Sequence, residues 1–163
     1  MKSELTGGVE APACGMGSPS CGAGDSCVLV VDDESVVRMF VARVLESEGY
    51  TVLSASDGAQ ALEILDLGEV SVDLVLTDIH MPRLGGVELG RRVAALESSV
   101  PVLYMSAELP DTIFDVGAGL TIPPFLLKPF SIATLVANVG RLLTAAPERL
   151  DVHRPEGSGH DAQ

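Results

Sequence analysis

Short apolar runs alternate with amphipathic segments five times along this chain of 163 residues, and that alternation limits its fold more than any other feature. The runs are "CVLVVDD", "YTVLSA", "VDLVLTD", "VPVLYMS" and "PFLLK", over residues 27–33, 50–55, 72–78, 100–106 and 124–128. They are apolar almost throughout, not at every second residue, as strands buried on both faces are. Successive parallel strands need helical crossovers. The sequence therefore predicts a doubly wound α/β fold, in which helices cover both faces of a five-stranded parallel sheet.

The amphipathic segments predict five helices, three of them from an apolar stripe at helical spacing and one from the signals at its ends. These four cover residues 36–49, 56–68, 86–97 and 131–143. The residues expected to face the core are Val37, Phe40, Val41 and Val44 in the first, Leu89, Val93 and Leu96 in the third, and Ile132, Leu135, Val136, Val139, Leu142 and Leu143 in the last.

Local signals mark the expected ends of these helices. Asp57 is predicted to cap the second helix, with Gln60 three residues on, and Gly68 is predicted to end it. Ser131 is predicted to cap the last helix. The remaining segment, residues 109–120, meets two glycines early and therefore predicts a short or irregular helix.

One domain, residues 27–144, contains the whole alternation. Residues 1–26 are rich in Gly, Ser, Pro and Ala without periodicity and predict a disordered leader, while residues 145–163 predict a flexible polar tail. The cysteines Cys14, Cys21 and Cys27 all lie at or before the first strand. A structural zinc site usually has four ligands, so we interpret these three residues as reduced, unpaired thiols.

The charge balance excludes one class of partner and favours another. The formal net charge is -13, whereas a nucleic-acid surface needs a clustered basic face. We therefore expect no nucleic-acid partner, and charged partners that are basic or are metal cations. No apolar run approaches the ~18 residues of a membrane span, and the first residues lack the apolar core of a secretory signal. The sequence predicts a cytoplasmic protein with no membrane contact.

Polar side chains follow four of the five predicted strands, at the point where each strand ends. In an open parallel sheet these ends share one rim, and ligands bind there. The second strand offers only Ser54 among small neighbours. The residues at the other four ends are Asp32 and Asp33, Asp78, Ser106 and Lys128.

Three carboxylates at one rim raise one another's pKa and destabilise a fold unless a cation lies among them. Oxygen ligands of this kind favour Mg²⁺, which also binds phosphate oxygens. A carboxylate beside a metal-bound phosphoryl group can act as its nucleophile. Ser106 and Lys128 supply a hydroxyl and an ammonium that could bind the other phosphoryl oxygens. A single Asp or Ser after a strand is more often a helix cap, as predicted for Asp57, but the full set indicates a phosphoryl-transfer site.

Four segments resemble the motifs of receiver domains from two-component response regulators. They are "VLVVDDE", "DLVLTDIHMPRLGG", "PVLYMSA" and "FLLKPF", and the resemblance covers residues 27–144. The resemblance implies a flavodoxin-like sheet with strand order 2-1-3-4-5. It also implies a Lys128–Pro129 peptide bond in the cis form.

The resemblance assigns a role to each rim residue. Asp78 is the implied phosphoacceptor, and Ser106 and Lys128 are the implied partners of its phosphoryl group. Phe125 matches the aromatic switch residue of the family. The implied Mg²⁺ ligands are Asp33, Asp78 and the backbone carbonyl of His80, with Asp32 acting through water. The side chains of His80 and Glu108 occupy the variable positions that tune autodephosphorylation in the family.

The resemblance further implies that a sensor histidine kinase donates the phosphoryl group and that a downstream protein or a phosphotransfer protein receives the signal. About twenty polar residues follow the last helix, so we expect a single-domain receiver without an output domain. It would not be an enzyme beyond its own phosphorylation and slow autodephosphorylation. Two alternatives remain open: a phosphate-independent pseudo-receiver, and a phosphohydrolase of the haloacid dehalogenase kind. The latter family has D-x-D at its nucleophile, where this chain has "DIH" at residues 78–80.

Overall fold

The computed structural model of the chain describes residues 26–96, 100–109 and 122–145. Its sheet has five parallel strands in the order β2-β1-β3-β4-β5, which confirms the predicted fold and strand order. The strands are β1 (Cys27–Val31), β2 (Thr51–Ala55), β3 (Leu74–Asp78), β4 (Val102–Ser106) and β5 (Phe125–Leu127).

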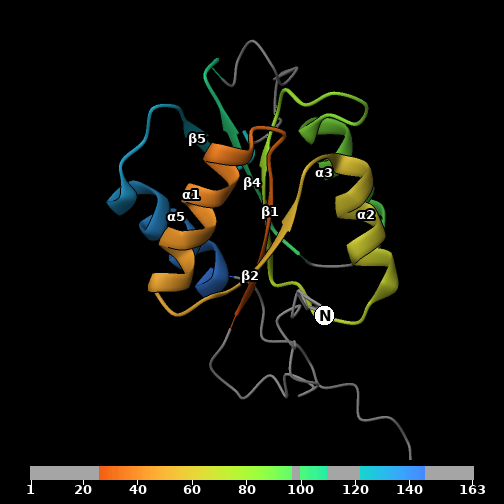
Figure 1. The fold of residues 1–163 in the computed structure, drawn as a ribbon, viewed down its shortest axis with the longest axis horizontal. Coiled ribbons are helices and arrows are strands. Elements are labelled where there is room, and N and C mark those ends of the chain that lie inside the picture. The colour runs from red at the N-terminus through yellow and green to blue at the C-terminus, as the bar shows by residue number, and fades with distance from the viewer. Residues whose placement is uncertain (1–25, 97–99, 110–121, 146–163) are drawn as a thin grey trace, which may run out of the picture.

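Helices cover both faces of this sheet, as Figure 1 shows. On one face lie α1 (Ser35–Ser47) and α5 (Ile132–Ala145), and on the other lie α2 (Gly58–Leu67) and α3 (Gly86–Ala95). Three predicted segments lie outside the described residues except for one boundary residue each. They are the helix predicted over 109–120, the leader (1–26) and the tail (145–163). Within the described residues, no helix has both the length and the apolar character that crossing a bilayer requires.

Two apolar cores lie on opposite faces of the sheet and share its central strands. Every residue of β1 and β3 is buried, because each strand has a neighbour on both sides and a helix layer above and below. Side chains alternate between the two cores along each strand. Toward α1 and α5 the buried set includes Val28, Val30, Leu74, Leu76, Leu103, Met105 and Leu126, and toward α2 and α3 it includes Leu29, Val31, Ala55 and Val75.

The predicted caps are present at the helix ends. One carboxylate oxygen of Asp57 accepts hydrogen bonds from the N–H groups of Ala59 and Gln60 at 2.9 and 3.0 Å. Gly68 ends the same helix in the left-handed conformation, with φ of 61°. The Ser131 hydroxyl accepts from the N–H of Thr134 at 3.1 Å, which confirms the cap of α5.

Three residues predicted to face the core are exposed instead: Phe40 (49%), Leu96 (44%) and Ile132 (51%). Phe40 lies on α1, whose buried residues are Val41, Val44 and Leu45. Leu96 follows the last residue of α3, and Ile132 is the first residue of α5. The apolar stripe read from the sequence is therefore wider and longer than the contact that each helix makes with the sheet.

The edge strand β5 is short and is flanked by prolines. It contains three residues, with Pro124 immediately before it and Pro129 two residues after its end. The Lys128–Pro129 peptide bond is cis, as the resemblance implied.

Candidate functional site

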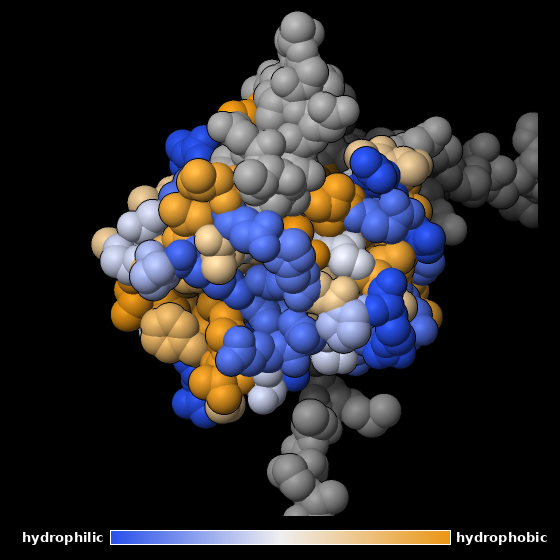
Figure 2. Space-filling model, turned by 90° about the horizontal axis from the view of Figure 1, so that it is seen from above, coloured by the Kyte–Doolittle hydropathy of each residue, from blue (hydrophilic) through white to orange (hydrophobic). Residues whose placement is uncertain are grey.

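The carboxyl ends of the strands meet at one rim, where the predicted site residues lie. Asp78 ends β3 and pairs in register with Met105, so the end of β4 at Ser106 lies beside it. The N–H of Lys128 donates to the carbonyl of Ser106 at 2.8 Å, which places the lysine next along the rim. Figure 2 looks down on this end of the molecule, where hydrophilic residues form a central band with hydrophobic residues on either side.

Lys128 joins two buried carboxylates at this rim. Its Nζ lies 2.7 Å from Oδ1 of Asp78 and 3.3 Å from Oδ2 of Asp32. Asp32 is 1% exposed and Asp78 is 7% exposed, whereas the lysine side chain is 25% exposed. Lys128 directly follows β5, and its partly buried side chain brings the ammonium to the acids. One ammonium therefore forms ion pairs with two carboxylates.

The electrostatics of the three groups are coupled. Burial raises the pKa of Asp32, and the nearby Asp78 charge raises it further, against the opposing effects of the Glu34 N–H and of Lys128. Burial alone would lower the pKa of Lys128, but its hydrogen bonds to Asp78 and Asp32 and their charges raise it overall. Lys128 is therefore a firmly protonated cation at neutral pH.

Backbone groups orient Asp78 and Ser106. The N–H of His80 donates to Oδ2 of Asp78 at 2.8 Å, so both oxygens of that carboxylate have a donor. The hydroxyl oxygen of Ser106, itself 1% exposed, accepts from the N–H of Glu108 at 3.0 Å.

The other predicted site residues lie farther from this contact. Asp33 is exposed beside the rim. The His80 side chain is also exposed, and its Nε2 lies 3.6 Å from Oε2 of Glu108, so the two variable side chains meet above the rim. Phe125 is half-buried on β5, in register with Tyr104 on β4.

The donor set at the rim suits a hard cation. In the described part of the chain, no three His, Cys, Asp or Glu side chains lie close enough together to hold a metal ion unaided. Asp32 and Asp78 are nevertheless neighbours, since both contact Lys128 Nζ. Mg²⁺ usually takes only one or two carboxylates and completes its shell with water and phosphate oxygens. The residues present therefore fit Mg²⁺ better than a metal such as zinc, which needs three or four protein ligands.

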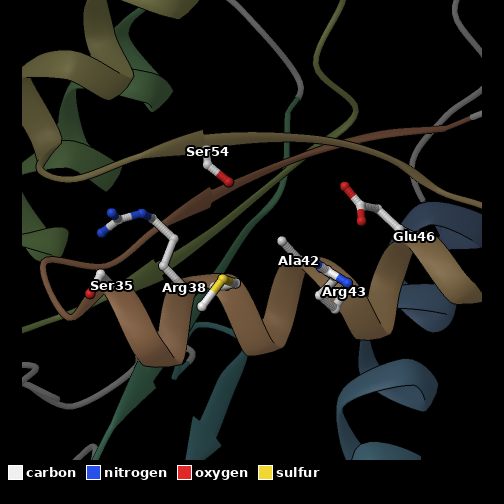
Figure 3. A pocket seen from close by; sticks show the side chains of 7 residues that line it. Ser35, Arg38, Ala42, Arg43, Glu46 and Ser54 are labelled. Carbon is white, nitrogen blue, oxygen red and sulfur yellow. The ribbon is translucent and has the colours of Figure 1, made fainter. Parts of the chain in front are cut away.

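Ser54, near the end of β2, does not join the rim. It points from β2 toward α1 across a hollow of about 330 Å³ (Figure 3). Arg38 also borders this hollow, and its Nη1 donates to the backbone oxygen of Asp32. The end of β2 therefore contributes no side chain to the site, while α1 supports the loop that carries the acidic pair.

One contact near the site was not predicted. Arg83, in the loop after Asp78, places Nη2 on the buried carboxylate of Asp57. Asp57 was correctly predicted as a cap, but a cap uses one oxygen and nothing in the sequence signals the partner of the other. The two residues are 26 positions apart and meet only because β1, β2 and β3 are adjacent in the sheet.

The fold and the rim together define a flavodoxin-like α/β protein with an acidic, lysine-bridged site at the carboxyl edge of its sheet. The family model "Response regulator receiver domain" matches residues 28–140. The chain therefore belongs to the response regulator receiver domain family, as its motifs indicated.

Individual relatives agree with this assignment. The transcriptional regulatory protein PrrA of Mycobacterium tuberculosis is 40% identical over 118 residues, which cover 71% of this chain and 49% of that protein. The sensor kinase CckA of Brucella abortus is 35% identical over 126 residues, covering 74% of this chain and 13% of the kinase. The chain spans about half the length of the response regulators that it matches.

Solved receiver structures have the same fold. A response regulator receiver protein from Sinorhizobium medicae superposes with a TM-score of 0.68 at 28% identity, covering 77% of this chain and 99% of that one. The response regulator TrrA of Thermotoga maritima, solved in complex with Mg²⁺ and BeF, has a TM-score of 0.62 at 26% identity, covering 72% and 98%.

Proposed function

We propose that the protein accepts a phosphoryl group from a partner histidine kinase onto Asp78, with Mg²⁺, in the cytoplasm. It then signals through a downstream protein or a phosphotransfer protein. The observation that carries this proposal is the Lys128 ammonium, 2.7 Å from Oδ1 of Asp78 and 3.3 Å from Oδ2 of Asp32. Two buried carboxylates beside one fixed ammonium suit a site that gains further negative charge in the reaction.

Phosphoryl transfer depends on an aligned nucleophile and on positive charge around the phosphoryl oxygens. One oxygen of Asp78 attacks phosphorus while the bond from phosphorus to the histidine nitrogen of the donor breaks. That nitrogen keeps the electron pair, and the product is an acyl phosphate on Asp78. Lys128 then pairs with a phosphoryl oxygen. Mg²⁺, held by Asp33, Asp78 and the His80 carbonyl with Asp32 through water, would neutralise charge on those oxygens.

Ser106 and Phe125 would turn this chemistry into a conformational signal. The Ser106 hydroxyl, which accepts from the Glu108 N–H in this structure, rotates to donate to a phosphoryl oxygen. Phe125 lies on the adjacent strand, on the face that Tyr104 and Ser106 share, and turns inward behind it. Phosphorylation therefore shifts an equilibrium between two arrangements of the β4–β5 edge.

The direct test is phosphorylation by acetyl phosphate and Mg²⁺, followed by intact-protein mass spectrometry. Wild type should gain one acid-labile phosphoryl group, and Asp78→Asn should gain none, because an amide is a poor nucleophile. Undiminished labelling of Asp78→Asn would refute Asp78 as the acceptor. A wild type that gains no mass would favour a phosphate-independent pseudo-receiver, and steady turnover of small phosphate esters would favour a hydrolase.

An apolar patch on α1 supports a protein phosphodonor. Val36, Met39 and Phe40 are 67%, 57% and 49% exposed on the first half of α1, which begins at Ser35, two residues after Asp33. Exposed apolar side chains beside a reactive site commonly mark a protein-binding surface.

Phe40→Asp should lower the transfer rate from the kinase by about tenfold or more, because a charge would enter the docking surface. Its rate with acetyl phosphate should match wild type, because the small donor does not need that surface. Leu67→Asp is the matched control, since Leu67 is a 68% exposed apolar residue on α2. Equal loss of transfer in both variants would contradict docking at α1.

A further inference from the structure

The loop that joins β3 to α3, residues 79–85, is closely packed at two places: its base, where it meets β3 and α3, and its tip, where it meets α2. At the base, a Cβ on Gly86 would lie 2.1 Å from the carbonyl oxygen of Asp78. At the tip, a Cβ on Gly58 would lie 2.5 Å from Cδ2 of Leu84 and 2.7 Å from its carbonyl oxygen. The loop is therefore closely packed between the end of β3 and the first turn of α2, with no room for an added Cβ at Gly86 or Gly58.

Arg83 stands at the centre of a tight turn at this tip. The N–H of Leu84 donates to the carbonyl of Pro82 at 2.9 Å, which closes a three-residue turn. Arg83 has φ of 68°, and no other non-glycine residue in the described ranges has a positive φ. Glycine adopts this conformation freely, whereas a residue with a Cβ is strained. An arginine at this position indicates that its side chain contributes something that glycine cannot.

That side chain ends on Asp57, the N-cap residue of α2. Nη2 of Arg83 contacts Oδ2, while Oδ1 accepts from the N–H groups of Ala59 and Gln60. The Asp57 side chain is 4% exposed, so the cap holds the acceptor in place and the arginine reaches across to it. The Gln60 N–H and, after it, the Arg83 charge lower the pKa of Asp57, which is therefore a carboxylate at neutral pH.

The same loop orients the carboxylate of Asp78. His80, three residues before Arg83, donates its N–H to Oδ2 of Asp78 at 2.8 Å. Lys128 holds the other oxygen at 2.7 Å. Because both oxygens are held, a displacement of the loop would turn the carboxylate relative to Lys128.

We infer that Arg83 is a positioning residue for phosphorylation: its contact with Asp57 fixes the β3–α3 loop, so that the His80 N–H keeps the Asp78 carboxylate in its reactive orientation. This inference rests on the proposed function and extends it to two residues outside the rim. The guanidinium acts through the loop, since its own contact is to Asp57.

The sharpest variant is Arg83→Gly, which removes the guanidinium and also relieves the positive φ. With acetyl phosphate and Mg²⁺, its maximal phosphorylation rate should fall about tenfold, because small misplacements of a reacting group are costly. The acetyl phosphate concentration at half-maximal rate should change little. The thermal midpoint should stay near wild type, because relief of strain offsets the freer unfolded chain. Arg83→Lys, which keeps a cation, should recover part of the rate.

Two further variants isolate the contact itself. Asp57→Asn keeps an oxygen for the cap but loses the charge, so it should lose as much rate as Arg83→Gly. The double variant should be no slower than either single variant, because both remove the same interaction. Arg92→Ala removes an arginine that pairs with Glu88 on α3, and it should react at the wild-type rate. A wild-type rate in Arg83→Gly, or multiplied losses in the double variant, would overturn the inference.

Amide hydrogen exchange at His80 reports the positioning without a phosphoryl donor. Arg83→Gly should accelerate that exchange about tenfold as the loop opens locally, while Arg92→Ala should leave it unchanged. A wild type that gains no phosphoryl group would refute the proposed function alone. Unchanged exchange at His80 in Arg83→Gly would refute the role of Arg83, whichever way the phosphorylation test ends.

Discussion

At the scale of single residues, the sequence could predict which side chains meet at the rim but not how they are held. Parallel strands bring their ends together, so residues that follow different strands had to become neighbours. Lys128 and Asp78, 50 positions apart, are in direct contact as expected. The Arg83–Asp57 contact could not be predicted, because it depends on a backbone turn with positive φ that most sequences place at glycine.

Asp57 should make the free energy of unfolding depend on pH in the acid range. Its pKa is lowered from 3.8 by the Gln60 N–H first and also by Arg83. A lowered pKa means that the carboxylate stabilises the fold above 3.8 and that this contribution is lost as the pH falls through the folded-state value.

Urea unfolding at a series of acid pH values would measure this effect. The free energy of unfolding of wild type should fall more steeply below about pH 4 than that of Asp57→Asn, which has no proton to bind at this site. If the free energy of unfolding falls equally steeply with acid pH in the two proteins, the assigned role of Asp57 is contradicted.

At the scale of elements, helix positions were predictable and their exact contact faces were not. A helix shows its apolar spacing in the sequence, but the sheet decides how much of that stripe is covered. Phe40 is half exposed on α1 although it continues the spacing of Val37, Val41 and Val44. The docking surface proposed above would account for its apolar character, and the periodicity of a single chain cannot reveal such a surface.

The packing of α3 on β4 depends on a glycine. A Cβ on Gly90 would lie 1.7 Å from the hydroxyl oxygen of Tyr104, so Gly90→Ala should destabilise the protein by about 1–3 kcal/mol through overpacking. Gly140 on α5 is the matched control, since its Cβ would meet the hydroxyl of Tyr50 at an ordinary 3.7 Å. Gly140→Ala should stabilise the protein by about 1 kcal/mol, because alanine favours a helix interior.

Chemical denaturation of both variants and of Gly90→Ala/Tyr104→Leu would test this explanation. The smaller leucine should restore most of the stability lost in Gly90→Ala, which a double-mutant cycle would show as a favourable coupling. Equal effects of alanine at positions 90 and 140 would mean that the close approach to Tyr104 does not limit α3.

At the scale of the whole molecule, the full sequence carries a formal net charge of -13, and two buried carboxylates at the rim share one lysine. A divalent cation at the rim should therefore stabilise the fold by more than general screening does. Mg²⁺ should raise the thermal midpoint by a few degrees beyond NaCl at equal ionic strength. Asp32→Asn should lose most of that difference, because it removes one of the two buried carboxylates.

Asp66→Asn is the control for this measurement, since it removes an exposed acid from α2 and leaves the rim intact. It should keep the full difference between Mg²⁺ and NaCl. If Asp32→Asn and Asp66→Asn respond alike, Mg²⁺ acts on the general charge of the protein and not on the rim.

The prolines beside β5 should limit aggregation of this protein through the edge of its sheet. A sheet with two open edges can add strands from other molecules and aggregate. On the β5 side, the edge is three residues long, and neither Pro124 nor Pro129 has an N–H to offer an incoming strand. At high protein concentration, molecules should therefore resist edge-to-edge pairing at β5. Mutations that replace either proline and lengthen β5 should lower solubility before they impair folding.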